Sequence, residues 1–283
     1  MADWQTRAEI DGDVVFFSYR GKELEKRMSN VFVWDLDKTY LDTKIDSLNG
    51  LLQAILERAG KKRNVAGTDT LLRGLAWTIY QKKAEEIFPL YFITASPPQM
   101  EDRIFSKLKY DEITPLGAFY KDNLKNLKPG RFWRLTKQVG YKIQALLQLR
   151  MRLADDVRQI LWGDDSESDA IIYNLYSDIC SRRRSTSELR EILEALFVHK
   201  EQVDRILELQ SELPDNDPVE RIYINLATDT DLDYYFKFGR RTLATSNTFE
   251  VALDLFQTSC LALEAVYAVT EDMISNYGFS PEE

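Results

Sequence analysis

The stretch that decides the fold is Val31-Phe32-Val33-Trp34-Asp35-Leu36-Asp37-Lys38-Thr39, an apolar run that ends in two acids and a hydroxyl. Residues 30–34 are mostly β-branched or aromatic, which predicts a buried strand. Both acids follow that strand, where like charges would repel one another and be poorly solvated. A divalent cation would resolve the conflict, although two acids one residue apart are also common in ordinary loops. The stretch therefore predicts a sheet strand with a cation site at its carboxyl end.

Short apolar runs alternate with longer stretches of helical period along the chain. This alternation predicts an α/β fold with a central parallel sheet covered by helices on both faces. The expected strands are residues 30–34, 90–94, 157–162 and 221–227, a weaker strand at 242–245 and an edge strand at 14–19. The expected helices are residues 45–59, 70–87, 98–107 and 136–152, and one long helix or two in sequence at 248–275.

Residues 185–213 form a charged helical stretch with a narrow apolar stripe. The stretch follows a run of three arginines, 182–184, and precedes a turn-forming sequence rich in Pro and Asp, 214–218. We expect an inserted helix or hairpin within residues 181–218, between two core strands. Its stripe is a candidate surface for a partner or for a second copy of the chain, and consists of Leu189, Ile192, Leu193, Leu196, Val203, Ile206 and Leu207.

Composition excludes several classes of function. A chain of 283 residues with a net charge of −9 does not favour a broad nucleic-acid surface, which needs clustered Lys and Arg. The single histidine, His199, argues against a His-rich zinc site and a Ser-His-Asp triad. Cys180 and Cys260 have no metal or redox spacing, so we expect buried, reduced thiols. No secretory signal and no membrane-spanning run is evident, and we expect a cytoplasmic protein.

A second group of candidate residues is Thr94-Ala95-Ser96, at the end of the strand expected at 90–94. Two prolines follow, and Pro98 is placed to open the next helix, where its missing N–H costs little. A hydroxyl and backbone N–H groups at a helix start suit a phosphate. The same residues would also serve as an ordinary helix cap.

The third and fourth candidates are Lys142 and the acidic run at 163–169, Gly163-Asp164-Asp165-Ser166-Glu167-Ser168-Asp169. Lys142 falls near the start of the helix expected at 136–152, where a cation is unfavourable unless an anion lies close. The acidic run follows an apolar strand and a glycine that would allow a tight turn. Its hard oxygen ligands suit magnesium better than zinc or copper. In an open α/β sheet all four groups would lie at the carboxyl ends of strands, where ligands bind.

The order and placement of these four motifs resemble the haloacid dehalogenase (HAD) superfamily. Within it the chain is most similar to the actin-patch-associated phosphatidate phosphatase family, through Asp42-Thr43-Lys44-Ile45, residues 65–75, residues 93–97 and the acidic run. That family commonly has Gly-Asp-Ser-Gly-Glu-x-Asp where this chain has Asp165 and Ser166 in the middle positions. The resemblance implies a single HAD-like domain over residues 1–283, a Rossmannoid three-layer sandwich. It also implies a flap and a small helical cap-like region, or no cap, at 41–89.

The resemblance also implies a reaction, the magnesium-dependent hydrolysis of a phosphomonoester. Asp35 would be the nucleophile that forms an aspartyl phosphate, and Asp37 the general acid and base. Thr94, with Ala95 and Ser96 in its turn, and Lys142 would bind the phosphoryl oxygens, and Thr39 would orient the loop. Magnesium would be held by Asp35, the backbone carbonyl of Asp37, Asp164, and either Asp165 or Asp169.

The substrate is left open by the sequence. A small cap would admit a lipid phosphate such as phosphatidate at a membrane surface, and the basic runs 61–63 and 182–184 could contact anionic headgroups. Soluble or protein phosphomonoesters fit the same site. A non-catalytic interaction module that binds a partner or forms a homo-oligomer through residues 185–213 is the alternative of a different class.

Overall fold

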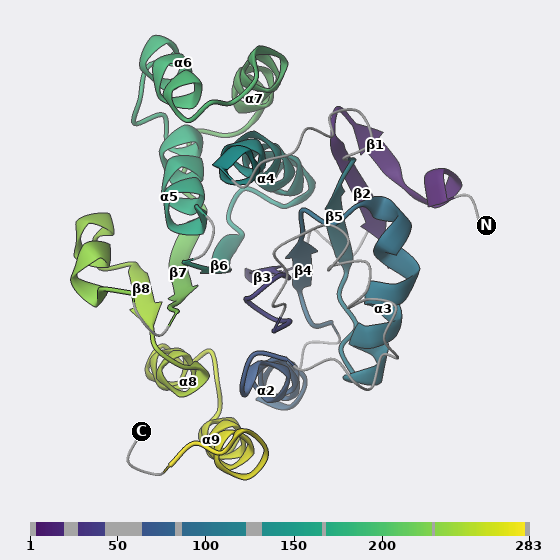
Figure 1. The fold of residues 1–283 in the computed structure, drawn as a ribbon, viewed down its shortest axis with the longest axis vertical. Helices are drawn as coiled ribbons and strands as arrows, with labels where there is room; N and C mark the ends of the chain where they lie inside the picture. Colours follow the sequence, from purple (N-terminus) through teal and green to yellow (C-terminus); the bar gives the residue numbers. More distant parts are fainter. Residues whose placement is uncertain are drawn as a thin grey trace.

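The structure is a computed structural model that describes residues 4–19, 28–42, 64–82, 87–122, 132–165, 168–227 and 230–280. Within them, one eight-stranded sheet is flanked by helices on both faces (Figure 1). Its strands are β1 (Glu9–Asp11), β2 (Val14–Ser18), β3 (Asn30–Asp35), β4 (Leu90–Ile93), β5 (Gly117–Lys121), β6 (Arg158–Asp164), β7 (Val219–Asn225) and β8 (Thr242–Thr245). The predicted α/β class with a central, mainly parallel sheet is therefore confirmed.

The helices are α2 (Thr68–Lys82), α3 (Glu101–Tyr110), α4 (Phe132–Arg152), α5 (Asp169–Cys180), α6 (Thr186–Ala195), α7 (Lys200–Glu212), α8 (Thr248–Gln257) and α9 (Leu263–Tyr277). The described residues also include the short 3-10 helices η1 (Trp4–Arg7), η4 (Pro98–Met100) and η6 (Leu232–Phe238). No helix among the described residues has both the length and the apolar character needed to cross a bilayer.

The strands are ordered β1-β2-β5-β4-β3-β6-β7-β8 across the sheet. The six from β5 to β8 are parallel, and β1 and β2 add an antiparallel hairpin at one edge. The central strand β3 pairs with β4 on one side and with β6 on the other, so the chain reverses its direction of winding there. This is the strand order of a doubly wound sheet, and its ligand crevice lies where the order reverses.

The side chains of β3 point alternately to the two faces of the sheet and contribute to a hydrophobic core on each face. Val31 and Val33 face α4 and α5, with the α6–α7 pair packed behind them. Phe32 and Trp34 face the opposite layer, which contains α2, α3, α8 and α9. Successive residues of a strand point to opposite faces, so one apolar run fills both cores.

One expectation about the strands was wrong, and one strand was not predicted. The segment expected as an edge strand at 14–19 is β2, which lies between β1 and β5. The strand β5 itself was not expected, although Ala118, Phe119 and Tyr120 are all buried. The helix expected at 45–59 and the basic run at 61–63 lie outside the described residues, as does about half of the flap and cap-like region at 41–89. Residues 248–275 form two helices, α8 and α9, one of the two forms expected.

The inserted segment is a helical hairpin, α6 and α7, between β6 and β7 as expected. Ser185 starts α6 with a capping box, in which its hydroxyl accepts from the backbone N–H of Glu188 and the Glu188 carboxylate accepts from the backbone N–H of Ser185. The stripe side chains Leu189, Leu193 and Val203 are fully buried in the core shared with α4 and α5. The stripe is therefore core rather than an open apolar face, and self-association through other parts of the segment stays a prediction.

The two cysteines are buried and free, as expected. Burial raises the pKa of the Cys180 thiol to about 12. The thiol is therefore protonated at neutral pH and is a poor nucleophile.

Candidate functional site

The candidate residues converge where the strand order reverses. Asp35 is the last residue of β3, Asp164 is the last residue of the neighbouring β6, and Thr94 directly follows β4. Trp34 of β3 is paired with Trp162 of β6, which brings the ends of the two strands level. Parallel pairing thus places three of the four sequence motifs at one edge, because parallel strands end on the same side of the sheet.

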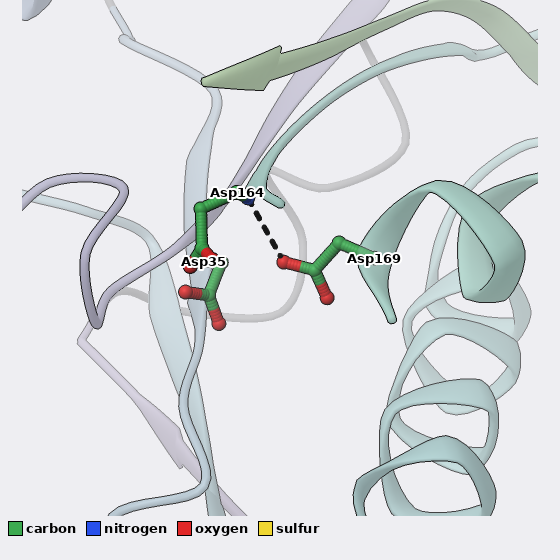
Figure 2. Close-up of side chains that lie close together, drawn as sticks. All are labelled: Asp35, Asp164 and Asp169. Atoms are coloured by element: carbon green, nitrogen blue, oxygen red, sulfur yellow. Dashed lines mark hydrogen bonds between the residues drawn. The ribbon is translucent and has the colours of Figure 1, made fainter. Parts of the chain in front are cut away.

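Three acids form a buried cluster at this edge. One carboxylate oxygen from each of Asp35, Asp164 and Asp169 lies within 4.8 Å of the others. Their exposed fractions are 1%, 2% and 0%. Asp169 enters from the first turn of α5, and its Oδ2 accepts a 3.3 Å hydrogen bond from the backbone N–H of Asp164 (Figure 2). Carboxylates at such separations repel strongly when buried, so the cluster needs compensating positive charge.

Lys142 supplies part of that charge. Its Nζ lies 2.8 Å from Oδ1 of Asp35 and 2.6 Å from Oδ1 of Asp169, and the residue is fully buried. The expectation that Lys142 lies near a helix start was wrong, because α4 begins at Phe132 and Lys142 is in its middle. The field of the helix dipole fades within the first turn, so the two carboxylates, rather than the helix end, set the electrostatics of this lysine.

The charges of the cluster do not cancel. Three carboxylates and one ammonium group leave two net negative charges in a buried space. One divalent cation would balance them. Oxygen ligands from carboxylates are the donors that magnesium prefers, and the cluster has no nitrogen or sulfur donor apart from the lysine ammonium, which cannot bind a metal. The residues present therefore fit magnesium.

The loop after β3 brings Asp37 and Thr39 to the same edge. Thr39 donates from Oγ1 to Oδ2 of Asp35 over 3.3 Å. Lys38 between them has a left-handed backbone with φ of 59°, and its N–H donates to the carbonyl of Leu41, which closes a tight loop. This conformation is costly for a residue with a side chain, and here it occurs in the turn between Asp37 and Thr39. Asp37 is left half-buried, whereas Asp35 is buried.

Thr94 joins this loop to the second motif. Its Oγ1 donates to Oδ2 of Asp37 over 3.0 Å and accepts from the backbone N–H of Ser96. Its carbonyl accepts a 2.8 Å bond from the hydroxyl of Tyr141, a positioning residue next to Lys142 that the sequence did not reveal. Ala95 is half-buried and Ser96 is buried in the turn that leads into η4. The structure thus brings Thr94 and Asp37 into direct contact.

Asp165 lies apart from the cluster. Its Oδ2 accepts from the backbone N–H of Ala227 over 2.9 Å and from the hydroxyl of Thr230. The sequence left open whether Asp165 or Asp169 lies nearer a metal, and it is Asp169 that joins Asp35 and Asp164. Burial and the nearby Asp165 raise the pKa of Tyr235 in η6 to about 12, so this phenol stays protonated beside the acidic loop.

Gly163 has a different role from the tight turn expected of it. It lies inside β6, and it is not among the glycines with a positive φ. A Cβ atom at this position would lie 2.4 Å from Oδ2 of Asp169. Glycine is required here because the Asp169 carboxylate packs directly against the strand backbone.

Comparison with known proteins gives no relative for this arrangement. No protein-family model matches the sequence, and no curated protein or solved structure is significantly similar to it.

Proposed function

We propose that this chain is a magnesium-dependent phosphomonoester hydrolase of the HAD type that acts through an aspartyl phosphate on Asp35. The observation that carries the proposal is the buried cluster of Asp35, Asp164 and Asp169 with Lys142 bridging two of its members. Counted over these four side chains, the cluster carries two net negative charges. It lies at the sheet edge where doubly wound folds bind phosphorylated ligands.

Asp35, Asp164 and Asp169 would hold the magnesium ion, which would neutralise charge on the cluster and on the phosphoryl oxygens. The backbone carbonyl of Asp37 is a further ligand implied by the sequence resemblance. Asp165, whose Oδ2 is occupied by Ala227 and Thr230, is not needed for this set.

In the first step a carboxylate oxygen of Asp35 attacks phosphorus, and the bond from phosphorus to the ester oxygen breaks. Lys142 binds Oδ1 of Asp35 over 2.8 Å, and Thr39 donates to Oδ2 over 3.3 Å, so both groups hold the carboxylate in place for the attack. Asp37, half-buried at the mouth of the site, donates a proton to the leaving alcohol.

In the second step water attacks the phosphorus of the aspartyl phosphate while Asp37 takes a proton from it. The bond from phosphorus to the Asp35 oxygen breaks, which releases inorganic phosphate and restores the carboxylate. The Oγ1 of Thr94 donates to Asp37 over 3.0 Å and holds its carboxylate in one orientation. Thr94 and Lys142 are also the groups placed to bind phosphoryl oxygens.

The substrate class has two candidates. The family resemblance favours phosphatidate or another lipid phosphate. The net charge of −9 favours soluble or protein phosphomonoesters, because an acidic protein gains no general attraction to an anionic membrane. A non-catalytic interaction module is disfavoured, because the acids of both acidic motifs are retained and the stripe of residues 185–213 packs against the core, with four of its seven side chains buried and three partly buried.

Phosphate release with magnesium tests the proposal on a panel that includes phosphatidate in mixed micelles and soluble phosphomonoesters. We expect hydrolysis of at least one class, its loss in EDTA, and its recovery when magnesium is added back. Asp35→Asn should abolish turnover because an amide is a poor nucleophile. Asp156→Asn, an exposed acid just before β6 at the opposite edge of the sheet, is the matched control and should retain the activity. Metal-independent hydrolysis, or full activity of Asp35→Asn, would refute the proposal.

A further inference from the structure

A small pocket opens beside the acid cluster, between the sheet and the helices α2 and α8. Its cavity volume is about 20 Å³, which is room for one or two oxygen-sized groups. Thr39, which contacts Asp35, and Gly163, against which Asp169 packs, both line it. The pocket is therefore lined by two residues that contact acids of the candidate site.

The indole rings of Trp34 and Trp162 line the pocket. Trp34 and Trp162 stack with ring centroids 4.8 Å apart, and Tyr223 continues the row at 4.9 Å from Trp162. The indoles are 1% and 3% exposed. Among the residues that the structure describes, neither indole N–H has a hydrogen-bond partner. Two buried N–H donors without an acceptor are unusual, since a buried donor left unsatisfied costs free energy.

The hydroxyl groups around the pocket already donate to other acceptors. The hydroxyl of Tyr223 donates to Asp254 over 2.7 Å, and that of Thr39 donates to Asp35. At the helix starts, Thr68 donates to the carbonyl of Val65 and Thr248 to that of Ala66. What the pocket lacks, within the described part of the chain, is an acceptor for the two indoles.

We propose that this indole pocket is a leaving-group subsite that takes an uncharged, hydrogen-bond-accepting oxygen of the alcohol to which the phosphoryl group is attached. The inference rests on the proposed phosphatase function, because the pocket adjoins the acids that would hold the phosphoryl group.

The lining determines the class of ligand. None of the described side chains around the pocket is Lys, Arg, Asp or Glu, and several are aromatic or aliphatic. Such a lining has no charged group to pair with an anion. An ether, ester or ketone oxygen, in contrast, can be buried in an apolar pocket if hydrogen-bond donors contact it. The volume admits one such oxygen and its neighbouring atom, so specificity would come from the position of the oxygen along the alcohol.

Isosteric substrates test the subsite. Butyl phosphate is compared with analogues in which an ether oxygen replaces one methylene at successive positions, such as 2-methoxyethyl phosphate. The measurement is the ratio of kcat/KM for each ether to that for butyl phosphate, which cancels any loss of folded enzyme. Trp34→Phe and Trp162→Phe keep an aromatic ring and remove the N–H. Trp77→Phe, a half-exposed indole on α2 outside the pocket, is the control.

We expect each pocket variant to lower the ratio for one ether position by roughly threefold to tenfold, the effect of one lost hydrogen bond. Trp77→Phe should leave every ratio unchanged. If the kcat/KM ratios do not change in Trp34→Phe or Trp162→Phe, the proposed subsite is wrong, but the proposed phosphatase function is unaffected. No phosphate release from any ester in magnesium would overturn the proposed function and the subsite with it.

A second measurement does not depend on the variants folding. In the unsubstituted chain with ¹⁵N-labelled tryptophan, the non-hydrolysable 2-methoxyethyl phosphonate or its positional isomers should shift two indole N–H resonances more than butyl phosphonate does. Equal shifts with the ether and alkyl phosphonates would overturn the subsite.

Discussion

Replacing Lys142 with methionine tests the charge balance of the acid cluster. The substitution keeps most of the side-chain volume and removes the ammonium group that lies 2.8 Å from Asp35 and 2.6 Å from Asp169. The net charge of the cluster changes from −2 to −3 in a fully buried space. Removing one partner of a buried ion pair costs about 3–5 kcal/mol, because the remaining charge stays buried. For a domain of this size that lowers the Tm by roughly 6–20 °C.

A second substitution separates charge from packing. Lys142→Met combined with Asp169→Asn returns the net charge of the cluster to −2. We expect the double variant to be more stable than Lys142→Met alone, because the amide removes one of the repelling carboxylates. The two substitutions share one cluster, so their effects on the free energy of unfolding should not add. Lys200→Met, at an exposed lysine in α7, is the control and should change stability by about 0.5 kcal/mol or less.

Thermal unfolding followed by circular dichroism, in EDTA and again in magnesium, provides the assay. In EDTA, Lys142→Met should show the largest loss of Tm. Magnesium should raise the Tm of Lys142→Met by more than that of the unsubstituted chain, because a cation that binds the folded state more tightly stabilises it more, and the variant cluster is more negative. An unchanged Tm for Lys142→Met in EDTA would refute the net negative charge assigned to the cluster. A double variant less stable than Lys142→Met would refute it equally.

Three further predictions concern other residues. Asp37→Asn should lower kcat/KM for alkyl phosphates by roughly 10²–10⁴-fold, and much less for p-nitrophenyl phosphate, whose leaving group needs no proton. Gly163→Ala should weaken magnesium binding, measured as a smaller rise in Tm on adding the ion, because its Cβ would lie 2.4 Å from Oδ2 of Asp169. Burial raises the pKa of Asp217, but hydrogen bonds led by that from Arg241 outweigh burial and lower the pKa below its ordinary value. An acid with a lowered pKa stabilises the fold above its unfolded pKa, so Asp217→Asn should lower the Tm at pH 7, and the difference should shrink as the pH falls below about 4.

A different result would contradict each of these three predictions. Equal losses on both kinds of substrate would show that Asp37 is not the acid for the leaving group. A rise in Tm for Gly163→Ala equal to that of the unsubstituted chain would show that Asp169 does not help to bind the ion. For Asp217, the nearby exposed Asp215→Asn is the control, and a Tm difference that persists unchanged at pH 3 would contradict the assigned pKa direction.

The central fold was predictable because β3 carries a strong local signal. Val31 to Trp34 form a continuous apolar run, which is typical of a strand buried on both faces. The strand β5 was missed because it begins with Gly117 and ends with the buried Lys121, which gives its short sequence the appearance of a loop. Its place in the sheet is determined by pairing with β2 and β4, and these contacts cannot be read from the strand itself.

The positions of site residues that directly follow strands could be predicted from the sequence. The positions that depend on contacts between residues distant in sequence could not. Asp35, Thr94 and Asp164 follow apolar strands, so their convergence follows from parallel pairing. The different placements of Asp164 and Asp165 could not be predicted, because Asp165 lies in the turn after β6 and its position depends on contacts that are distant in sequence. Asp165 is held by Thr230, which is distant in sequence, and no local pattern encodes that contact.

Trapping the covalent intermediate tests the central proposal most directly. Asp37→Asn, incubated with magnesium and p-nitrophenyl phosphate labelled with ³²P, should accumulate label because a good leaving group departs without an acid while hydrolysis lacks its base. We expect the label on Asp35, removable by hydroxylamine, and absent both in EDTA and when Asp35→Asn is added to the same chain. Turnover without any label, or label on a residue other than Asp35, would contradict the proposed role of this carboxylate.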